Sequence, residues 1–488
     1  MKIIVVLVLV TLFLKFPQFY SQNNPVQDKL DLFIKTLESE GAAVSFKAIN
    51  LDSENIVAQH NKDMKLPTAS IMKLFTTATG FEELGKFYTP TTNFYHDGYI
   101  DSNGVLYGNL WVKGGGDPSL GSRYFYKEED RRKFLYDFVD SILATGIKSI
   151  NGNVIADGSS FGYKGAPEGW SWGDMGNYYG AGPSGCVLFD NSIYLDFETS
   201  KTLNDSTTII CTDPYVDGLN FYNMVKTSKV QRDRAYIFGA PYGLDRVISG
   251  TLPFGKESFE IKGSIPDPEK LLAQEVTFEL NQKINITGNA KSYREMTYNS
   301  PKVKVYEDEK LLFTYPGKTL STLIYWTNMR SINLFAEQIL CHIGLNKMAS
   351  GSTGSGANYM ESYWSKKLNT TIYASDGSGL SRKNAASASD FCELLKYMHK
   401  SENFEDYKST LPVAGKSGTL KSVCRGQTAS GRMFAKSGTM TRIKAYSGYV
   451  ESTSGRKLAF CIIVNNHPYS SYELVKKMEP IFNAMARY

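Results

Sequence analysis

Residues 67–73 read Pro-Thr-Ala-Ser-Ile-Met-Lys and predict the start of a helix, with Thr68 as a candidate N-cap. Residues three apart share one face of a helix, so the side chains of Ser70 and Lys73 come within reach of each other. A serine is a weak nucleophile until a base takes its proton, and a lysine can be that base where its surroundings lower its pKa. The pattern S-x-x-K is weak by itself, because a second copy stands at Ser454–Lys457 in a predicted solvated turn.

Two further motifs follow this one along the chain. Ser331-Ile332-Asn333 stands at the start of an amphipathic stretch that predicts a helix over about 331–345, where a serine and an amide can also be a simple cap. Lys436-Ser437-Gly438-Thr439 predicts a strand in which the glycine lets a ligand backbone approach and the lysine can bind a carboxylate. Neither motif is specific alone, since S-x-N occurs elsewhere and Lys416-Ser417-Gly418-Thr419 is a near-copy of the second motif.

The two ends of the chain are alike in kind, whereas the middle differs. Strands are predicted at four places near the ends: Ala43–Asn50, Asn55–Gln59, Tyr446–Val450 and Leu458–Asn465. Helices are predicted there as well, over about 23–41, 388–400 and 470–487. Residues 93–315 contain short β-rich segments separated by turns, and Val276–Leu280 is predicted as one of these strands. We expect the first and last strands to share one sheet, which makes the middle an insertion.

Composition excludes several classes of protein. The 488 residues predict about three domains, and 42% hydrophobic with 21% charged residues excludes a disordered chain. The net charge of +5, from 54 basic and 49 acidic residues, is too weak to indicate a nucleic-acid partner. Five histidines and the lack of a C-x-x-C pattern in the sequence leave little room for a common zinc site.

The N-terminus predicts export. Lys2 precedes an apolar run over residues 3–14, which is too short to span a bilayer and is typical of a secretory signal peptide cleaved after Ser21. An N-terminal membrane anchor is the alternative interpretation. Export would permit disulfides among the six cysteines, of which Cys186 and Cys211 are the first pair to test, although buried free thiols are favoured.

The three motifs in this order are typical of penicillin-binding proteins and serine β-lactamases. The wide spacing between Lys73 and Ser331 indicates inserted domains that a simple β-lactamase lacks. Five flanking stretches add to the pattern: Lys113–Pro118, Gly169–Asp174 followed by Tyr178-Tyr179, Asp376–Arg382, Leu411–Gly415 and Ser447–Val450. With these stretches, the sequence closely resembles the class C low-molecular-mass penicillin-binding proteins, the S13 D-Ala-D-Ala carboxypeptidase/endopeptidases, over nearly all of the mature chain.

This resemblance implies the roles of individual residues. The implied catalytic residues are Ser70 as nucleophile, Lys73 as its base, Ser331 as proton relay and Asn333 as the holder of the substrate amide. The implied substrate-binding residues are Lys436, Ser437, Gly438, Asp174, Tyr179 and Arg382. Backbone N–H groups of Ser70 and Thr439 would form the oxyanion hole. Asp174 would meet the ammonium group of diaminopimelate, with a plain turn residue as its alternative role, and Tyr179 and Arg382 have structural alternatives as well.

The resemblance also implies the fold and the domain order. The expected fold class is α/β (α+β), a β-lactamase/transpeptidase-like domain with an antiparallel sheet flanked by helices and with nested β-rich inserted domains. The expected segments are the signal peptide 1–21, a catalytic domain of 22–92 and 318–488, an inserted domain of 93–192 and 293–317, and a second inserted domain of 193–292.

The implied function is that of an exported serine D-Ala-D-Ala carboxypeptidase, periplasmic or associated with the cell wall. Its partners would be peptidoglycan stem peptides as substrates and β-lactam antibiotics as covalent inhibitors, with no metal or organic cofactor. Endopeptidase action on crosslinks and the oligomeric state stay open. Two alternatives remain: a β-lactamase or esterase of the same fold, and a non-catalytic peptidoglycan-binding protein.

Overall fold

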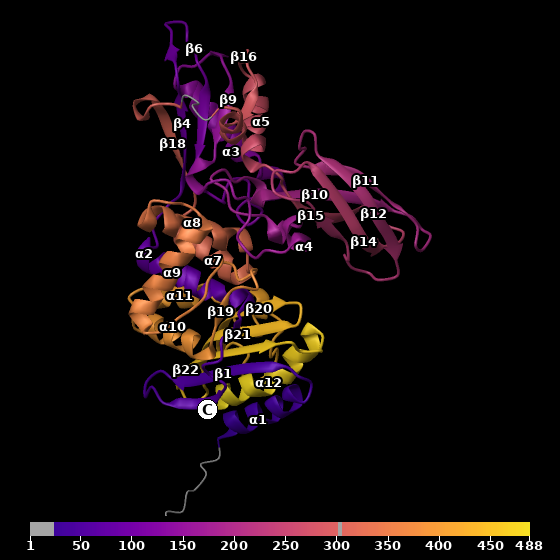
Figure 1. The fold of residues 1–488 in the computed structure, drawn as a ribbon, viewed down its shortest axis with the longest axis vertical. Coiled ribbons are helices and arrows are strands. Elements are labelled where there is room, and N and C mark those ends of the chain that lie inside the picture. Colours follow the sequence, from indigo (N-terminus) through magenta and orange to yellow (C-terminus); the bar gives the residue numbers. More distant parts are fainter. Residues whose placement is uncertain (1–23, 301–304) are drawn as a thin grey trace, which may run out of the picture.

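A five-stranded antiparallel sheet forms the base of the computed structural model, which describes residues 24–300 and 305–488 (Figure 1). Its strands lie in the order β2 (Ile56–His60), β1 (Ala43–Asn50), β22 (Lys457–Asn465), β21 (Ile443–Glu451) and β20 (Met433–Met440). β1 pairs with β22 along its whole length, from Ala43 opposite Asn465 to Asn50 opposite Leu458. This pairing confirms that strands from the two ends of the chain share one sheet. The predicted signal peptide, residues 1–21, lies outside the described residues.

Helices cover both faces of this sheet. α1 (Pro25–Glu38) and α12 (Ser471–Arg487) pack side by side on one face, where Phe46, Phe460 and Phe482 belong to one apolar core (Figure 1). The layer on the other face contains α2 (Lys73–Glu83), α7 (Leu320–Arg330), α8 (Asn333–Met348), α9 (Thr353–Leu368), α10 (Ala388–Lys400) and α11 (Phe404–Ser409). A short pair of strands, β3 (Leu66–Pro67) and β19 (Ala385–Ala386), borders this layer.

A second body stands on the helical layer and contains two sheets. The first sheet has the order β17 (Ala290–Ser292), β9 (Val154–Asp157), β7 (Leu110–Gly114), β4 (Thr91–His96) and β18 (Leu311–Pro316). The second has the order β16 (Asn285–Ile286), β8 (Ser149–Asn151), β6 (Val105–Tyr107) and β5 (Tyr99–Ile100). Helices α3 (Lys133–Ala144), α5 (Pro268–Asn281) and α6 (Tyr293–Asn299) accompany them. The chain enters and leaves this body through paired strands, since Thr91 of β4 lies opposite Pro316 of β18.

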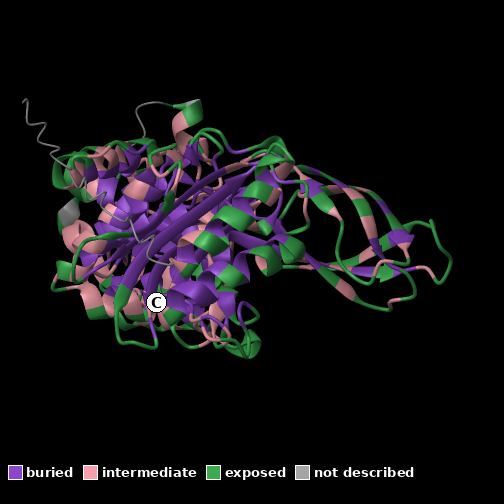
Figure 2. Cartoon of the chain, turned by 90° about the horizontal axis from the view of Figure 1, so that it is seen from below, coloured by how far each residue is buried: buried purple, intermediate pink, exposed green. Residues whose placement is uncertain are grey.

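An arm projects from the second body and is formed by six strands (Figure 1). They are β10 (Ser192–Thr199), β11 (Thr207–Asp213), β12 (Asn220–Ser228), β13 (Tyr236–Phe238), β14 (Asp245–Pro253) and β15 (Phe259–Ser264), in two sheets of order β11-β10-β15 and β12-β14-β13. The arm also begins and ends with a strand pair, because Ser192 lies opposite Ser264. Figure 2 shows its strands with many exposed residues, whereas the strands of the main body are mostly buried. Short helix α4 (Trp172–Met175) lies near the base of the arm (Figure 1).

Three local expectations differ from the structure. Val276–Leu280 lies within α5 and is not a strand, because Asp267 caps the helix, Pro268 starts it, and its buried residues follow a helical spacing. The segment 285–292 pairs with β8 and β9, although the expected division placed it with the arm. The Thr68 hydroxyl makes no N-cap hydrogen bond, since it donates to the Ala69 carbonyl instead, 3.1 Å away.

Two further expectations from the sequence concerned disulfides and a membrane anchor. The six thiols are free of one another, five of them buried and Cys211 exposed. Within residues 24–300 and 305–488, no helix combines the length and the apolarity needed to cross a bilayer.

Candidate active site

Ser70 lies on a short 3-10 turn, Ala69–Met72, that leads directly into α2. On this turn Ser70 is half-buried, whereas the Lys73 side chain points into the interior and is fully buried. The Lys73 ammonium nitrogen Nζ is 3.1 Å from Ser70 Oγ. It also donates to Asn333 Oδ1 and to the carbonyl oxygen of Ser378, each at 2.7 Å. The predicted serine–lysine pair is therefore in hydrogen-bond contact, and Lys73 is held by two further partners.

Burial sets the proton affinity of Lys73. Removal from water disfavours the charged amine and lowers the pKa of Lys73 to about 7, although the nearby Asp376 and Glu337 carboxyl groups act in the opposite direction. An amine with this pKa is partly neutral near pH 7, and only the neutral form can accept the Ser70 proton. The site can thus provide a base without a histidine.

The S-x-N motif lies at the junction of α7 and α8. Ser331 ends α7 in a left-handed backbone conformation, with a φ of 60°, and Asn333 is the first residue of α8. The strained backbone at Ser331 is the kind of feature that surrounding structure must enforce. Asn333 bridges two parts of the molecule, since its Oδ1 accepts from Lys73 and its Nδ2 donates to the Tyr179 carbonyl oxygen at 2.8 Å. Both side chains therefore lie beside the serine–lysine pair.

The K-S-G-T motif lies on β20, one of the two edge strands of the sheet. Lys436 is buried and its Nζ donates to Ser331 Oγ at 2.8 Å, which links the second and third motifs. Burial, together with the neighbouring Lys73 and Lys444 charges, holds the pKa of Lys436 well below its usual value. A Cβ at Gly438 would lie 3.1 Å from the backbone nitrogen of Ser70, so the glycine permits the close approach of β20 to the nucleophile turn.

The near-copy at 416–419 has a different conformation. Its residues precede and begin a 3-10 turn, Gly418–Leu420, whereas residues 436–439 lie in a strand as predicted. The two copies are nevertheless neighbours, because Ser437 Oγ donates to Thr419 Oγ1 at 2.8 Å. This contact orients the Ser437 hydroxyl, a role for the near-copy that the sequence did not indicate.

One cleft of about 410 Å³ brings together most of the predicted site residues. Its lining includes Ser70, Ser331, Asn333, Thr439, Asp174, Tyr179 and Arg382. Lys73 and Lys436 lie buried behind this lining, in contact with Ser70 and Ser331. The cleft separates the nucleophile turn and β20 from the loop around α4, so a ligand inside it would touch both. The other two predicted residues, Ser437 and Gly438, lie on β20 between Lys436 and the lining residue Thr439.

The three residues predicted for side-chain recognition all line the cleft. Asp174, on α4, accepts a hydrogen bond from Ser171 Oγ at 2.7 Å. Burial and the adjacent Asp174 carboxylate raise the pKa of Tyr179, so its phenol stays protonated. The Arg382 guanidinium donates to the Thr441 carbonyl oxygen at 3.2 Å, at the end of β20. An acidic side chain in this position is suited to a ligand ammonium group.

Two buried carboxyl groups support the site, and sequence reasoning gave neither of them a role. Glu337 on α8 accepts hydrogen bonds from the backbone nitrogens of Gly377 and Ser378, at 2.8–3.1 Å, and burial raises the pKa of Glu337 to about 8. Asp376 accepts from Trp170 Nε1 at 2.8 Å and from the Gly379 nitrogen at 2.7 Å. Together they hold the loop whose Ser378 carbonyl receives Lys73. The only sequence signal for Glu337 is an acidic residue within an apolar helix face.

A serine–lysine pair at the start of a helix, facing the edge of an antiparallel sheet, defines the class of active-site-serine enzymes that contains penicillin-binding proteins and serine β-lactamases. The sequence model of the D-Ala-D-Ala carboxypeptidase 3 (S13) family matches residues 26–488. The chain therefore belongs to this family and is a serine-type D-Ala-D-Ala carboxypeptidase of the class C low-molecular-mass penicillin-binding proteins. The predicted family, fold class and enzyme class are confirmed.

Individual relatives agree with this assignment over most of their length. The D-alanyl-D-alanine carboxypeptidase DacB of Haemophilus influenzae is 26% identical over 461 residues, which cover 91% of this chain and 89% of that protein. The D-alanyl-D-alanine carboxypeptidase of Actinomadura sp. strain R39 is 24% identical over 457 residues, 91% of this chain and 81% of that protein. The crystal structure of penicillin binding protein 4 from Haemophilus influenzae has the same fold, with a TM-score of 0.78 at 22% identity, over 94% of this chain and 99% of that chain.

Proposed function

We propose that the chain cleaves the terminal D-Ala–D-Ala bond of peptidoglycan stem peptides through an acyl-enzyme on Ser70. The observation that carries this proposal is the 3.1 Å contact between Ser70 Oγ and a buried Lys73 amine whose pKa is lowered to about 7. Lys73 takes the hydroxyl proton, and Ser70 Oγ attacks the carbonyl carbon of the penultimate D-alanine. The backbone N–H groups of Ser70 and Thr439 stabilise the negative oxygen that forms.

The second half of the reaction uses the other two motifs. Lys436 and Ser437 bind the carboxylate of the departing D-alanine, next to the Ser331 hydroxyl that contacts Lys436. Ser331 passes a proton to the leaving amine, and Asn333 holds the amide of the substrate backbone. Water then hydrolyses the ester on Ser70 and restores the enzyme.

The remaining expectations belong to the same proposal. Asp174, Tyr179 and Arg382 hold the side-chain end of the stem peptide, where Asp174 pairs with the free ammonium group of diaminopimelate. The Haemophilus influenzae protein with the same fold has a structure in complex with a β-lactam, and we propose that penicillin acylates Ser70 of this chain. Export to the cell wall by the signal peptide 1–21 would bring the enzyme to this substrate.

Intact-protein mass spectrometry after incubation with benzylpenicillin tests the nucleophile. We expect one stable adduct of the mass of the antibiotic on the wild type and none on Ser70→Ala, because the acyl bond forms on that hydroxyl. A matched control is Ser454→Ala, which removes the serine of the second S-x-x-K pattern, in an exposed turn. Unmodified protein with consumed penicillin would indicate a β-lactamase, and unmodified protein with intact penicillin a binding protein without catalysis.

A further inference from the structure

Lys444 is a buried lysine of the catalytic sheet that the reaction described above does not use. It lies on β21, is only 7% exposed, and stands directly opposite Thr439 of β20. Its Nζ donates a hydrogen bond to Thr439 Oγ1 at 2.7 Å. Thr439 is exposed and lines the cleft that contains Ser70. The ammonium group of Lys444 therefore reaches the wall of the cleft through one hydroxyl group.

The charge of Lys444 has no counter-ion. Among residues 24–300 and 305–488 it forms no ion pair, and burial lowers its pKa to about 8. Two titratable groups that feel its charge, Lys436 and His467, are both basic. Its Nζ also lies 5.2 Å from the centre of the Tyr446 ring, which attracts it less than a carboxylate would. A buried charge without a partner costs folding free energy, and such costs are typical of functional sites.

The lysine of the K-S-G-T motif is less suited to attract a carboxylate. Lys436 Nζ already donates to Ser331 Oγ and to the Ser437 carbonyl oxygen, each at 2.8 Å. Burial and the nearby Lys73 and Lys444 charges hold the pKa of Lys436 well below its usual value and so disfavour its charged form. A neutral amine still donates a hydrogen bond but lacks the charge. Since an amine with a pKa of about 8 is mostly charged near pH 7, Lys444 carries positive charge at this end of β20.

The two hydroxyl groups of the motif differ in where their hydrogens point. A lysine ammonium group has no lone pair, so Thr439 Oγ1 accepts the bond from Lys444 and its own hydrogen points elsewhere. In the described part of the chain, residues 24–300 and 305–488, that hydrogen has no acceptor. The Ser437 hydroxyl, in contrast, donates to Thr419 Oγ1 at 2.8 Å. Thr439 thus offers a ligand in the cleft a free donor that an adjacent cation polarises.

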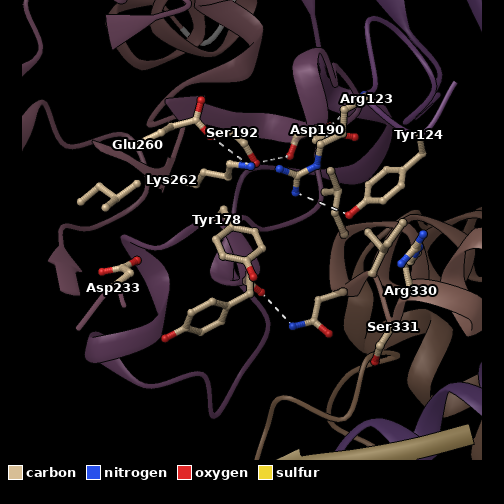
Figure 3. A pocket seen from close by; sticks show the side chains of 15 residues that line it. Arg123, Tyr124, Tyr178, Asp190, Ser192, Asp233, Glu260, Lys262, Arg330 and Ser331 are labelled. Carbon is tan, nitrogen blue, oxygen red and sulfur yellow. Dashed lines mark hydrogen bonds and ion pairs between the residues drawn. The ribbon is translucent and has the colours of Figure 1, made fainter. Parts of the chain in front are cut away.

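Other cations around the site are paired or exposed. A hollow of about 350 Å³ adjoins the cleft at Ser331, and its Arg123 is paired with Asp190 at 3.7 Å (Figure 3). Arg330 in this hollow and Arg382 in the cleft are exposed, so water and salt screen their charges. Lys444 therefore contributes a positive charge that is neither paired nor strongly screened.

We propose that Lys444 is a positioning residue for the acylation of Ser70, because it holds the Thr439 hydroxyl with its hydrogen toward the ligand and polarises it for a carboxylate. This inference rests on the proposed function, in which the carboxylate of the leaving group lies at β20. In the peptide substrate this carboxylate belongs to the terminal D-alanine. In benzylpenicillin it is the carboxylate next to the β-lactam nitrogen.

The test compares benzylpenicillin with its methyl ester, which lacks only the free carboxylate. Intact-protein mass spectrometry over time gives the second-order rate constant for acylation, and the wild type should prefer the free acid. Lys444→Met should slow acylation by benzylpenicillin about tenfold, the effect of a lost charged hydrogen bond, and acylation by the ester less than about twofold. Lys444→Arg, which keeps the charge, should stay within about threefold of the wild type. The matched control Lys47→Met removes a buried lysine from β1 of the same sheet and should change neither rate.

Two further measurements separate positioning from a structural role. Thr439→Val removes the hydroxyl and keeps the backbone N–H. The double variant Lys444→Met/Thr439→Val should lose less than the product of the two single losses, because the lysine acts through that hydroxyl. Urea unfolding of Lys444→Met should occur at the same or a higher urea concentration than that of the wild type, since an unpaired buried charge is removed.

Several outcomes would overturn the proposal. They are an unchanged rate for Lys444→Met with benzylpenicillin, a full product of losses in the double variant, and equal losses on acid and ester with a lower urea midpoint, which would assign Lys444 a structural role. A wild type that the acid and the ester acylate equally fast would also overturn it and leave Ser70 as the nucleophile. A wild type that neither compound acylates would reject the proposed function and this inference with it.

Discussion

At the scale of single residues, the group in contact with the Ser70 hydroxyl is a buried amine, whereas many serine enzymes have a histidine there. Lys73 is fully buried and contacts Ser70, Asn333 and the Ser378 carbonyl at once. Burial favours its neutral form, while Glu337 and Asp376 limit how far its pKa falls. The balance of these two influences decides how much neutral base is present at a given pH.

The pH dependence of acylation follows from this balance. Because Lys73 must be neutral and its pKa is about 7, the rate constant for penicillin acylation should rise with pH, half-maximal near 7, and level off above it. Below that pH the rate should fall about tenfold per unit, because the neutral fraction does. Stopped-flow measurements with a fluorescent penicillin, with circular dichroism to confirm folding at each pH, would provide the profile. A rate that does not change between about pH 5 and about pH 9 would remove Lys73 as the base.

Sequence reasoning at this scale predicted side chains that do lie together in one site, and it missed the groups that hold them in place. Ser70, Lys73, Ser331 and Lys436 belong to short motifs whose order is informative. Glu337 was missed because its partners, the backbone nitrogens of Gly377 and Ser378, lie far away in the chain and have no side-chain pattern. Backbone groups that accept or donate hydrogen bonds are the same for every residue type, so a sequence does not show which of them will be used.

At the scale of elements, the site depends on close contact between segments that are distant in the chain. Gly379 has a φ of 81°, and a Cβ there would lie only 1.9 Å from the Ala69 carbonyl oxygen on the nucleophile turn. The loop that holds Lys73 through Ser378 thus presses directly on the turn that carries Ser70. The glycine is required for both its backbone conformation and its lack of a side chain.

Gly379→Ala should therefore displace the nucleophile turn. We expect the penicillin acylation rate to fall about 10²-fold, as a shift of about 1 Å at a reacting group can produce. The control is Gly354→Ala on α9, where a Cβ meets nothing within 4 Å. Acylation kinetics and urea unfolding of both variants would separate misplacement from unfolding. Equal rates for the two variants would show that the contact between loop and turn does not position Ser70.

Helices and strands with a regular apolar pattern were predicted well, whereas an element whose type depends on a capping residue was predicted wrongly. The strands at the two ends of the chain and the helices 388–400 and 470–487 were expected and are present. Val276–Leu280 was assigned to a strand because valine, threonine and phenylalanine favour strands, although the cap at Asp267 starts a helix well before it. The strand propensity of residues 276–280 was thus overridden by the helix-start signal at Asp267 and Pro268.

At the scale of the whole molecule, the apolar cores follow the division into bodies. One core joins the second body and the arm and contains Phe138, while separate cores lie on the two faces of the catalytic sheet, one of them around Phe482. A small apolar cluster around Phe335 connects the helical layer above the catalytic sheet with the second body. Strand pairing leads us to propose boundaries that modify the expected ones: 265–292 joins the second body, and 192–264 forms the arm.

Separate cores predict separate unfolding steps. Scanning calorimetry should resolve two transitions, and Phe138→Ala should lower one of them, since a lost core phenylalanine costs about 3–5 kcal/mol. Phe482→Ala should lower the other, and penicillin should shift only the transition that Phe482→Ala affects. A single transition moved equally by both substitutions would mean that the bodies unfold as one unit.

The paired strands through which the chain enters each inserted part have a consequence for how such proteins change over evolutionary time. Thr91 faces Pro316 at the base of the second body, and Ser192 faces Ser264 at the base of the arm. Each inserted part is attached through a pair of strands, β4 with β18 or β10 with β15, whose ends are already adjacent. The part beyond such a pair can therefore be lengthened, shortened or exchanged while the pairing of the two strands is kept. The arm can therefore be treated as a separate module, and an engineer could transplant it to a related scaffold with the strand pair at its base as the splice point.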